Sequence, residues 1–542
     1  MSNNTADQAK KKLVIIGGGL SGLAAGVYAQ KAGYDSEIYE RNTVPGGECI
    51  GWDRKGYHID GCIHWLTGTS TSDPLNMTWR DVGALSDDVE IYQPENFCVV
   101  ETGDTTIHLY HDFDRTKKHL LEIAPEDTEP LEELFAITQA CFHAMIPATA
   151  PELMNPKELF RLITSSGKQQ KAMKVLQKVT LREYVQRFKN PGIRLILSAV
   201  LPEECSAYML PYTLATVVTG NGGRPAGGSR AMSLRMADKY RSLGGKLILG
   251  TTVDEIVVEN GLATGIRIPI GKTRNTEAGT DTDTDSGSVK GKDSGTAKSE
   301  TTCIAADRVL STTDVHVTLG KLLHGKYPVE AFDMRDADPK IYTPLTGCQA
   351  AFGLDLDLSG MEPDLIFGID PIRFEDHELT ALSFKHYCYE PTFAPSGHSS
   401  ISIFLEGNYD WWKALLTDET SSPDALHISS EKYLTEKQRV LDDISAALCK
   451  KYPEWEGHLI PLDFVTPLTY ERYCGAYKGR WMSYGITPRS KRLMHNGKIK
   501  GLDNFIMGGQ WLMPSGGTPV ALITGKWAIQ RLAKKDKLTW RF

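Results

Sequence analysis

Residues 12–47 carry the pattern that most restricts the fold of this chain: an apolar run, a glycine-rich turn, an alanine-rich stretch and a second apolar run ending in an acid. Leu13–Ile16 is short, apolar and β-branched, which suits a strand buried on both faces. A G-x-G-x-x-G pattern begins at Gly17, and Glu40 follows the second run about 20 residues later. This order predicts a dinucleotide-binding β-α-β unit.

Each part of this unit has a physical task at a dinucleotide. Gly17 permits the tight turn, Gly19 lets the backbone approach a pyrophosphate, and Gly22 lets the helix pack closely on the strand. Unpaired amides and the positive end of the helix dipole then face the phosphates. We expect Glu40 to accept hydrogen bonds from the adenosine ribose, and its charge disfavours the 2′-phosphate of NADP.

Length and composition narrow the class of protein. The 542 residues exceed a single core of ordinary size, so we expect two interleaved domains. The net charge of -8 argues against general nucleic-acid binding, because phosphates require a cationic face. No run approaches the roughly 18 apolar residues of a membrane span, and the N-terminus has no apolar signal core. We therefore expect a cytoplasmic protein.

The ten cysteines form no C-x-x-C pair, which disfavours a zinc module and a disulfide scaffold. We accordingly predict no metal site. No Ser-His-Asp order or phosphate-transfer loop is evident either, so the chemistry is expected to come from the bound dinucleotide.

The chain alternates between two kinds of segment. Residues 1–110, 215–320 and 495–542 are predicted to form one discontinuous dinucleotide-binding domain. Residues 111–214 and 321–494 are predicted to form a substrate domain with a mixed or antiparallel sheet and a helical lid. Residues 272–299 are rich in Thr, Asp, Ser and Gly, which predicts a flexible loop.

Both ends of the chain together resemble the FAD-dependent phytoene desaturase, carotenoid isomerase and retinol saturase family, which is more distantly related to the amine oxidases. Four segments carry the resemblance. They are the glycine pattern through Glu40 and Gly46-Gly47, then GYHIDG at 56–61, GGSRAMSLRMADKYRSLGGKLILGTTVDEI at 227–256, and GGQWLMPSGGTPVALITGKWA at 508–528. The resemblance implies an α/β fold in which a Rossmann-like FAD-binding domain is interleaved with an α+β substrate domain.

The resemblance also implies which residues hold FAD. The adenosine and phosphates are assigned to Gly17, Gly19, Gly22, Glu40, Arg41, Gly46 and Gly47. The adenine is assigned to the backbone of Val253. The flavin end is assigned to Gly509, Gln510, Gly516, Gly517, Thr518 and Pro519, where a helix N-terminus would face the flavin N1 and C2 carbonyl.

Two residues depart from the family pattern. The family usually has Gly-Asp in the terminal turn, with the Asp bonding a ribityl hydroxyl, whereas Gly509 is followed here by Gln510. Glu48 stands where a basic residue is common. Because an amide can still bond a hydroxyl, we expect FAD to be retained.

With a flavin as the reactive group, hydride transfer needs a substrate carbon near flavin N5 in a dry pocket. The catalytic candidates are His64, Tyr473 and Tyr484; imidazole can move a proton near neutral pH. Each is also compatible with ordinary core packing. Aromatic side chains that suit an extended apolar substrate are His64, Trp65, Tyr473, Tyr477, Trp481, Tyr484 and Trp511, together with Met513.

These expectations favour an FAD-dependent oxidoreductase that desaturates, saturates or isomerises carbon–carbon double bonds of a lipophilic substrate, such as a carotenoid, a retinoid or an unsaturated fatty acid. Two alternatives stay open: an amine-oxidase-like flavoprotein and a flavin-free prenyl-lipid carrier of the same fold. Basic and apolar residues alternate between Lys157 and Lys189. This stretch is either a solvated helix face or a face in peripheral contact with anionic membrane lipid. The oligomeric state stays open.

Overall fold

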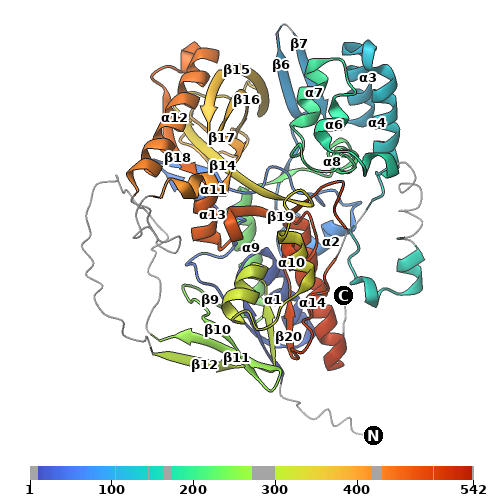
Figure 1. The fold of residues 1–542 in the computed structure, drawn as a ribbon, viewed down its shortest axis with the longest axis vertical. Coiled ribbons are helices and arrows are strands. Elements are labelled where there is room, and N and C mark those ends of the chain that lie inside the picture. Colours follow the sequence, from blue (N-terminus) through green and yellow to red (C-terminus); the bar gives the residue numbers. More distant parts are fainter. Residues whose placement is uncertain are drawn as a thin grey trace.

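The computed structural model describes residues 10–103, 105–144, 146–160, 162, 173–270, 300–416, 430–491 and 494–539. Figure 1 shows two stacked halves, with a parallel sheet and its helices in the lower half and a larger sheet flanked by helices in the upper half. The predicted flexible loop 272–299 lies outside the described residues.

Five parallel strands form the centre of the lower half, in the spatial order β20-β13-β1-β2-β9. Leu13, Val14 and Ile15 of the central strand have no exposed surface, which is why this run is wholly apolar. The strands are drawn from the beginning, middle and end of the chain: β1 (Lys12–Ile16), β2 (Asp35–Tyr39), β9 (Lys246–Ile248), β13 (Arg308–Ser311) and β20 (Phe505–Met507). The predicted Rossmann-like fold class is confirmed.

Three helices pack on this sheet: α1 (Leu20–Ala32), α9 (Gly228–Ser242) and α14 (Thr518–Asp536). The close packing of helices α1 and α14 against their neighbours depends on two glycines. A Cβ at Gly26 would lie 2.8 Å from Ile38 and Tyr240, and a Cβ at Gly525 would lie 2.3 Å from the carbonyl oxygen of Ser21. The closing helix α14 therefore packs directly against the helix that follows the glycine loop. Below the sheet, Figure 1 shows the antiparallel set β10 (Glu255–Glu259), β11 (Leu262–Pro269) and β12 (Thr301–Ala305).

The upper half contains an eight-stranded, mostly antiparallel sheet in the order β18-β14-β17-β16-β15-β6-β7, with β19 paired to β14. Its strands are β6 (Asn96–Thr102), β7 (Thr105–Tyr110), β14 (Tyr342–Leu354), β15 (Asp364–Phe374), β16 (His377–His386), β17 (Ser399–Glu406), β18 (Leu459–Val465) and β19 (Arg480–Ile486). Strands β6 and β15 run parallel, so the sheet is mixed. The helix α12 (Glu431–Lys451) packs on it through buried Val440, Ile444 and Leu448.

The boundary predicted at residue 110 is wrong for β6 and β7. The sequence analysis assigned residues 96–110 to the dinucleotide-binding domain, but β6 pairs with β15 in the large sheet. The physical reason is that this strand pairing joins residues more than 250 positions apart. A local apolar pattern predicts a strand but does not identify its partner.

Helices gather beside β6 and β7 in the upper half, as Figure 1 shows. They share a core in which Leu131, Leu134 and Ile196 are fully buried. These helices are α3 (Phe113–Ile123), α4 (Thr128–Ala140), α6 (Leu181–Val185), α7 (Pro191–Ser198) and α8 (Met209–Val218). The remaining elements are α2 (Pro74–Asp81), α10 (Glu330–Asp336), α11 (Tyr409–Ala414), α13 (Pro467–Cys474) and strands β3 (Gly51–Arg54), β4 (Tyr57–Asp60), β5 (Ile91–Tyr92) and β8 (Arg224–Pro225). Among the described residues, no helix is both long and apolar enough to cross a bilayer.

Candidate functional site

The glycine loop after β1 is built around two positions that exclude a side chain. Gly17 has a φ of +99°, in the region that favours glycine. A Cβ at Gly22 would lie 1.9 Å from the Gly17 carbonyl oxygen, so the first turn of α1 packs directly on the loop. The loop therefore presents bare backbone at the carboxyl edge of the parallel sheet, where open α/β sheets bind ligands.

Glu40 follows directly on β2, at the same edge. Its side chain is 6% exposed and accepts hydrogen bonds from the backbone N–H groups of Gly18 at 2.7 Å and Asn42 at 2.8 Å. Burial raises the pKa of Glu40, and these backbone donors oppose that effect. Thr251 N–H donates to the Glu40 carbonyl at 2.8 Å, which brings the segment of Val253 beside it. The two predicted adenosine contacts are thus neighbours.

A second glycine turn lies against the first. Gly46 N–H donates to the Gly18 carbonyl at 2.9 Å, and a Cβ on Gly47 would lie 3.2 Å from the Gly19 Cα. Both Gly46 and Gly47 have positive φ, at 129° and 64°. Arg41 lies farther out, and its Nη2 donates to the Arg472 carbonyl of α13 at 2.9 Å.

Thr312 is a site residue that the sequence analysis missed. It follows β13 at the carboxyl edge, and its hydroxyl donates to the carbonyls of Ile16 and Gly17, at 3.0 Å each. These bonds fix the end of β1 where the glycine loop begins. The available signal was its place directly after a buried apolar run, Val309–Leu310, because parallel strands share one carboxyl edge.

The closing segment joins the same edge. Gly508 N–H donates to the Ser311 carbonyl at 2.8 Å, and Gly509 N–H donates to the Thr524 hydroxyl at 3.0 Å. The side chain of Gln510, in the short helix η6 (Gln510–Leu512), accepts from Gly517 N–H at 2.8 Å. Gly517 directly precedes Thr518 and Pro519, so Gln510 holds the start of α14.

The two departures from the family pattern contact each other. Nε2 of Gln510 donates to Oε2 of Glu48 at 2.7 Å. Burial and the nearby Asp314 carboxylate raise the pKa of Glu48 to about 8, and the bond from Gln510 lowers it only in part. Gly516 completes this corner, where an added Cβ would lie 2.8 Å from the backbone nitrogen of Ser483. The hydroxyl of Ser483 is buried without a hydrogen-bond partner.

His64 lies on the segment that leaves β4. Asp60, 2% exposed, accepts from the N–H groups of Ile63 and Ser229 at 3.1 and 2.7 Å, which fixes this segment against the start of α9. The His64 ring lies 4.0 Å from that of Phe404. Burial, reinforced by the charge of Lys385, lowers the pKa of His64 to about 3.

The backbone of neutral His64 contacts a buried cluster of charged residues, Arg224, Asp364 and Lys385. Arg224 forms an ion pair with Asp364, and Lys385 contacts the same carboxylate at 2.6 Å. Arg224 Nε also donates to the His64 carbonyl at 2.9 Å. Because the imidazole is uncharged throughout the physiological range, it does not act as an imidazolium acid there.

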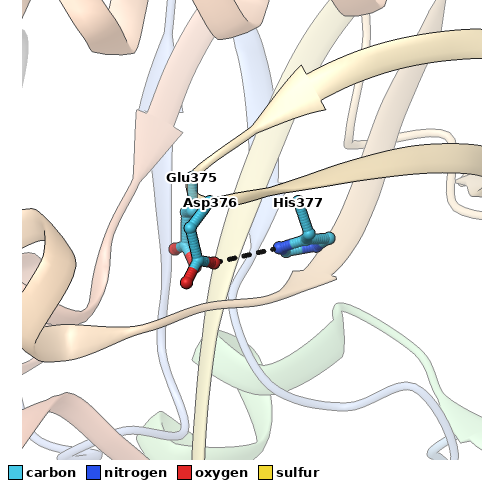
Figure 2. A group of neighbouring side chains, drawn as sticks. All are labelled: Glu375, Asp376 and His377. Atoms are coloured by element: carbon cyan, nitrogen blue, oxygen red, sulfur yellow. Dashed lines mark ion pairs between the residues drawn. The ribbon is translucent and has the colours of Figure 1, made fainter.

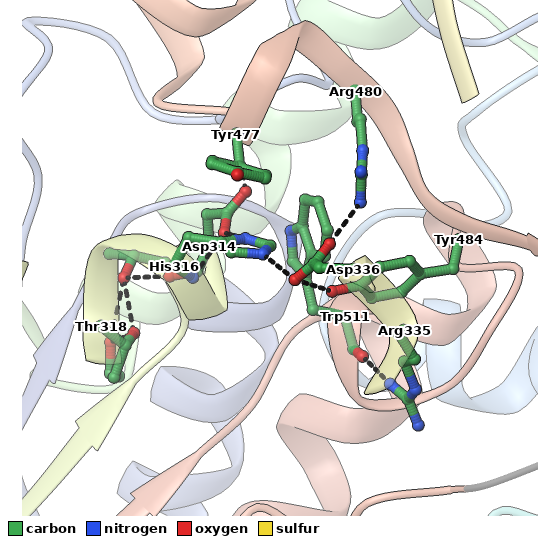
Figure 3. A network of polar contacts seen from close by, with 11 residues as sticks. Asp314, His316, Thr318, Arg335, Asp336, Tyr477, Arg480, Tyr484 and Trp511 are labelled. Carbon is green, nitrogen blue, oxygen red and sulfur yellow. Dashed lines mark hydrogen bonds and ion pairs between the residues drawn. The ribbon is translucent and has the colours of Figure 1, made fainter. Parts of the chain in front are cut away.

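Tyr484 belongs to a different cluster, shown in Figure 3. His316 lies between two carboxylates, with Nδ1 2.7 Å from Asp314 and Nε2 2.6 Å from Asp336. The Tyr484 hydroxyl donates to Asp336 at 3.1 Å, and Arg480 contacts the same carboxylate at 3.1 Å. Burial lowers the pKa of His316, but the two carboxylates more than compensate and raise it to about 9.

Aromatic rings enclose this imidazolium. Tyr477 is stacked on His316 at 3.7 Å, and Trp511 meets it edge-on at 5.1 Å. Tyr473, by contrast, is 40% exposed on α13. His64, Tyr473 and Tyr484 therefore do not converge on one another, although Trp511 lies beside the cofactor-side residue Gln510.

A separate group of possible ligand atoms lies at the β15–β16 turn, shown in Figure 2. Glu375, Asp376 and His377 lie close together, and His377 Nδ1 is 3.6 Å from Asp376. Oε1 of Glu375 already accepts from Trp412 Nε1 at 2.7 Å and from Asn408 N–H at 2.8 Å. Its geometry is that of a side chain that closes a turn, and we assign no metal to it.

The fold and this site define a protein of the Rossmann dinucleotide-binding class. The family model described as an NAD(P)-binding Rossmann-like domain matches residues 15–82. The chain is 22% identical to the 4,4'-diaponeurosporene oxygenase of Staphylococcus haemolyticus, across 96% of this chain and 97% of that protein. It is 20% identical to the chloroplastic prolycopene isomerase of Daucus carota, across 88% and 72% of the two chains.

A third relative is the all-trans-retinol 13,14-reductase of Danio rerio, 21% identical across 93% of this chain and 83% of that protein. Among solved structures, an oxidoreductase from Methanosarcina mazei matches with a TM-score of 0.56 and 15% identity, across 96% of this chain and all of the other. The predicted resemblance to the phytoene desaturase, carotenoid isomerase and retinol saturase family is confirmed.

Proposed function

We propose that this protein is an FAD-dependent oxidoreductase that desaturates, saturates or isomerises carbon–carbon double bonds of a lipophilic substrate, such as a carotenoid, a retinoid or an unsaturated fatty acid. The observation that carries the proposal is the meeting of the opening and closing segments at one sheet edge, where Gly508 bonds Ser311 beside the glycine loop. Similarity over most of the chain to enzymes named for 4,4'-diaponeurosporene, prolycopene and all-trans-retinol supports this substrate class.

Three features support FAD as the dinucleotide. The nearest atoms to a Cβ added at Gly19 would be backbone atoms of Gly46 and Gly47, at 3.7 Å, so the two glycine turns meet through bare backbone. Glu40 offers a carboxylate at the ribose position of a Rossmann site. The N-terminus of α14, which Gln510 bonds through Gly517, offers a positive dipole end.

When bound, FAD would supply the group that accepts or donates hydride. The chain's own residues supply binding and orientation. The backbone of Gly17 and Gly19 would hold the pyrophosphate, and Gln510 fixes the start of α14 through Gly517. The packed rings of His64 and Phe404 would exclude water from an apolar substrate.

Of the catalytic candidates, we propose His64 as part of the pocket wall, because its low pKa removes the acid role expected from the sequence. Tyr484 is proposed as a positioning residue that acts through Asp336 and Trp511. Tyr473 is proposed at the outer rim, in keeping with its exposure.

The visible spectrum of the purified protein tests the cofactor. We expect flavin absorbance that is released as FAD on heat denaturation. Incubation with a carotenoid, with retinol and with an unsaturated fatty acid, followed by chromatography of the products, then tests the reaction. A protein that stays colourless after FAD addition would favour the flavin-free carrier, and stoichiometric peroxide with amines alone would favour the amine oxidase.

We also propose peripheral contact with an anionic lipid surface. Leu159, Phe160 and Val175 are 48%, 69% and 61% exposed, and the neighbouring Lys157 and Lys174 are exposed as well. Apolar side chains beside cations suit insertion at a charged interface. Within the predicted basic stretch, residues 161 and 163–172 lie outside the described residues.

Sedimentation with phosphatidylserine-containing vesicles at low salt tests the membrane contact. We expect Phe160→Gln to reduce the bound fraction severalfold. Met77→Gln, which removes a 72% exposed apolar side chain from another surface, serves as the matched control and should leave it unchanged. Equal binding of both variants and the parent protein would refute the contact.

A further inference from the structure

The direction of the hydrogen bond between Glu48 and Gln510 is fixed by the other contact of Gln510. Oε1 of Gln510 accepts the Gly517 N–H at 2.8 Å, so the other end of the amide must be the NH₂ group. That NH₂ donates to Oε2 of Glu48 at 2.7 Å. Oε2 of Glu48 is thus an acceptor, and its second oxygen, Oε1, is left for another partner.

Among the described residues, no Lys, Arg or His forms an ion pair with Glu48, and the Asp314 carboxylate adds negative charge from the loop after β13. The other titratable groups that face it are Cys62 after β4, and Tyr470 and Cys474 on α13. A hydrogen bond with Cys49 together with burial raises the pKa of Cys62, and burial raises the pKa values of Tyr470 and Cys474, so all three groups stay neutral near pH 8.

The position of Glu48 relative to the glycine turns completes the geometry. Glu48 follows Gly47, where an added Cβ would lie 3.2 Å from the Cα of Gly19. Gln510, which bonds Glu48, also bonds Gly517 at the start of α14. Glu48 therefore lies between the predicted phosphate end and the predicted flavin end of the cofactor. An ionised carboxylate there would repel a pyrophosphate, which carries two negative charges. Offsetting that repulsion would need a cation paired with Glu48.

We infer that Glu48 is an FAD-binding residue that acts as a neutral carboxylic acid, accepting from Gln510 through one oxygen and donating its proton to an oxygen of the cofactor through the other. The inference rests on the proposed FAD cofactor. It also explains why the two departures occur together. A neutral acid beside an amide has the same net charge as the basic residue and Asp that the family pattern leads one to expect.

This arrangement couples FAD binding to protonation. The raised pKa of about 8 belongs to the free protein, and a donated hydrogen bond stabilises the protonated form further when FAD is bound. Below pH 8 the acid is already protonated, so affinity is constant. Above it, Glu48 must take one proton from solvent as FAD binds, and the Kd rises by about tenfold per pH unit.

The experiment measures the Kd of FAD for the flavin-free full-length protein from pH 6.5 to 9.5 by quenching of flavin fluorescence. We expect a Kd about tenfold higher at pH 9 than at pH 7 for the parent protein. Glu48→Gln should give a nearly flat profile. Glu259→Gln, an exposed glutamate on β10 in the same half of the molecule, should retain the parent slope. Circular dichroism verifies that each variant is folded.

A second readout needs no variant. Calorimetric titration of the parent protein with FAD at pH 8.5, in two buffers that differ in ionisation enthalpy, counts the protons taken up. We expect uptake of about three-quarters of a proton at pH 8.5 and close to none at pH 6.5. Tight FAD binding with no proton uptake, or a Glu48→Gln profile as steep as the parent's, would overturn the inference and leave the proposed function standing. Failure of FAD to bind at any pH would instead reject the proposed function and this inference with it.

Discussion

Replacing His316 tests the charged cluster that joins the two halves of the molecule. The imidazole bonds Asp314 and Asp336 at 2.7 and 2.6 Å, and burial is outweighed by these carboxylates, so its pKa rises from 6.5 to about 9. A difference of this size corresponds to about 3 kcal/mol of stabilisation by the protonated form. The contribution is fully present below pH 6.5, falls between pH 6.5 and 9, and is lost above about pH 9.

The variant His316→Gln keeps a donor but cannot carry the charge. We therefore expect it to be less stable than the parent at pH 6, and the gap in free energy of unfolding to narrow by about 3 kcal/mol by pH 9.5. Denaturant unfolding of both proteins at five pH values measures this gap in free energy. Subtracting the variant's value from the parent's at each pH cancels the contributions of the other titrating groups. His143→Gln, an exposed histidine, is the control. A gap that is constant or widens with pH would refute the assignment of a buried imidazolium.

Two further substitutions test the dinucleotide site. Gly22→Ala forces a Cβ to 1.9 Å from the Gly17 carbonyl, so we expect a loss of about 3 kcal/mol in stability together with most of the FAD affinity. Gly320→Ala, where an added Cβ meets open space, should change neither; equal effects of both changes would contradict the packing argument. Thr312→Val keeps the side-chain shape but removes the hydroxyl that donates to the carbonyls of Ile16 and Gly17, and should cost about 1–2 kcal/mol in thermal unfolding and weaken FAD binding. An unchanged midpoint would show that Thr312 does not hold the loop.

Local signals predicted the cofactor side of the fold well. The helix α14 begins at Thr518, as predicted, because a proline in the first helical turn is a local sequence signal. Residues 96–110 were assigned to the dinucleotide-binding domain, whereas β6 pairs with β15, which lies far along the chain. Contacts between side chains that are far apart in the sequence could not be predicted from local patterns either. Glu48 and Gln510 were each identified as departures, but their hydrogen bond joins residues 462 positions apart.

The reaction itself depends on protons as well as on hydride. Saturation of a double bond needs a proton at the second carbon, desaturation releases one, and isomerisation has no net requirement. His64, with a pKa of about 3, is not protonated at neutral pH and therefore does not provide an imidazolium for saturation. His316 is protonated, but its two ring nitrogens are held by Asp314 and Asp336, and Tyr477 covers its face. Neither histidine is therefore a free acid for saturation, and product analysis with retinol as substrate tests whether another group supplies that proton.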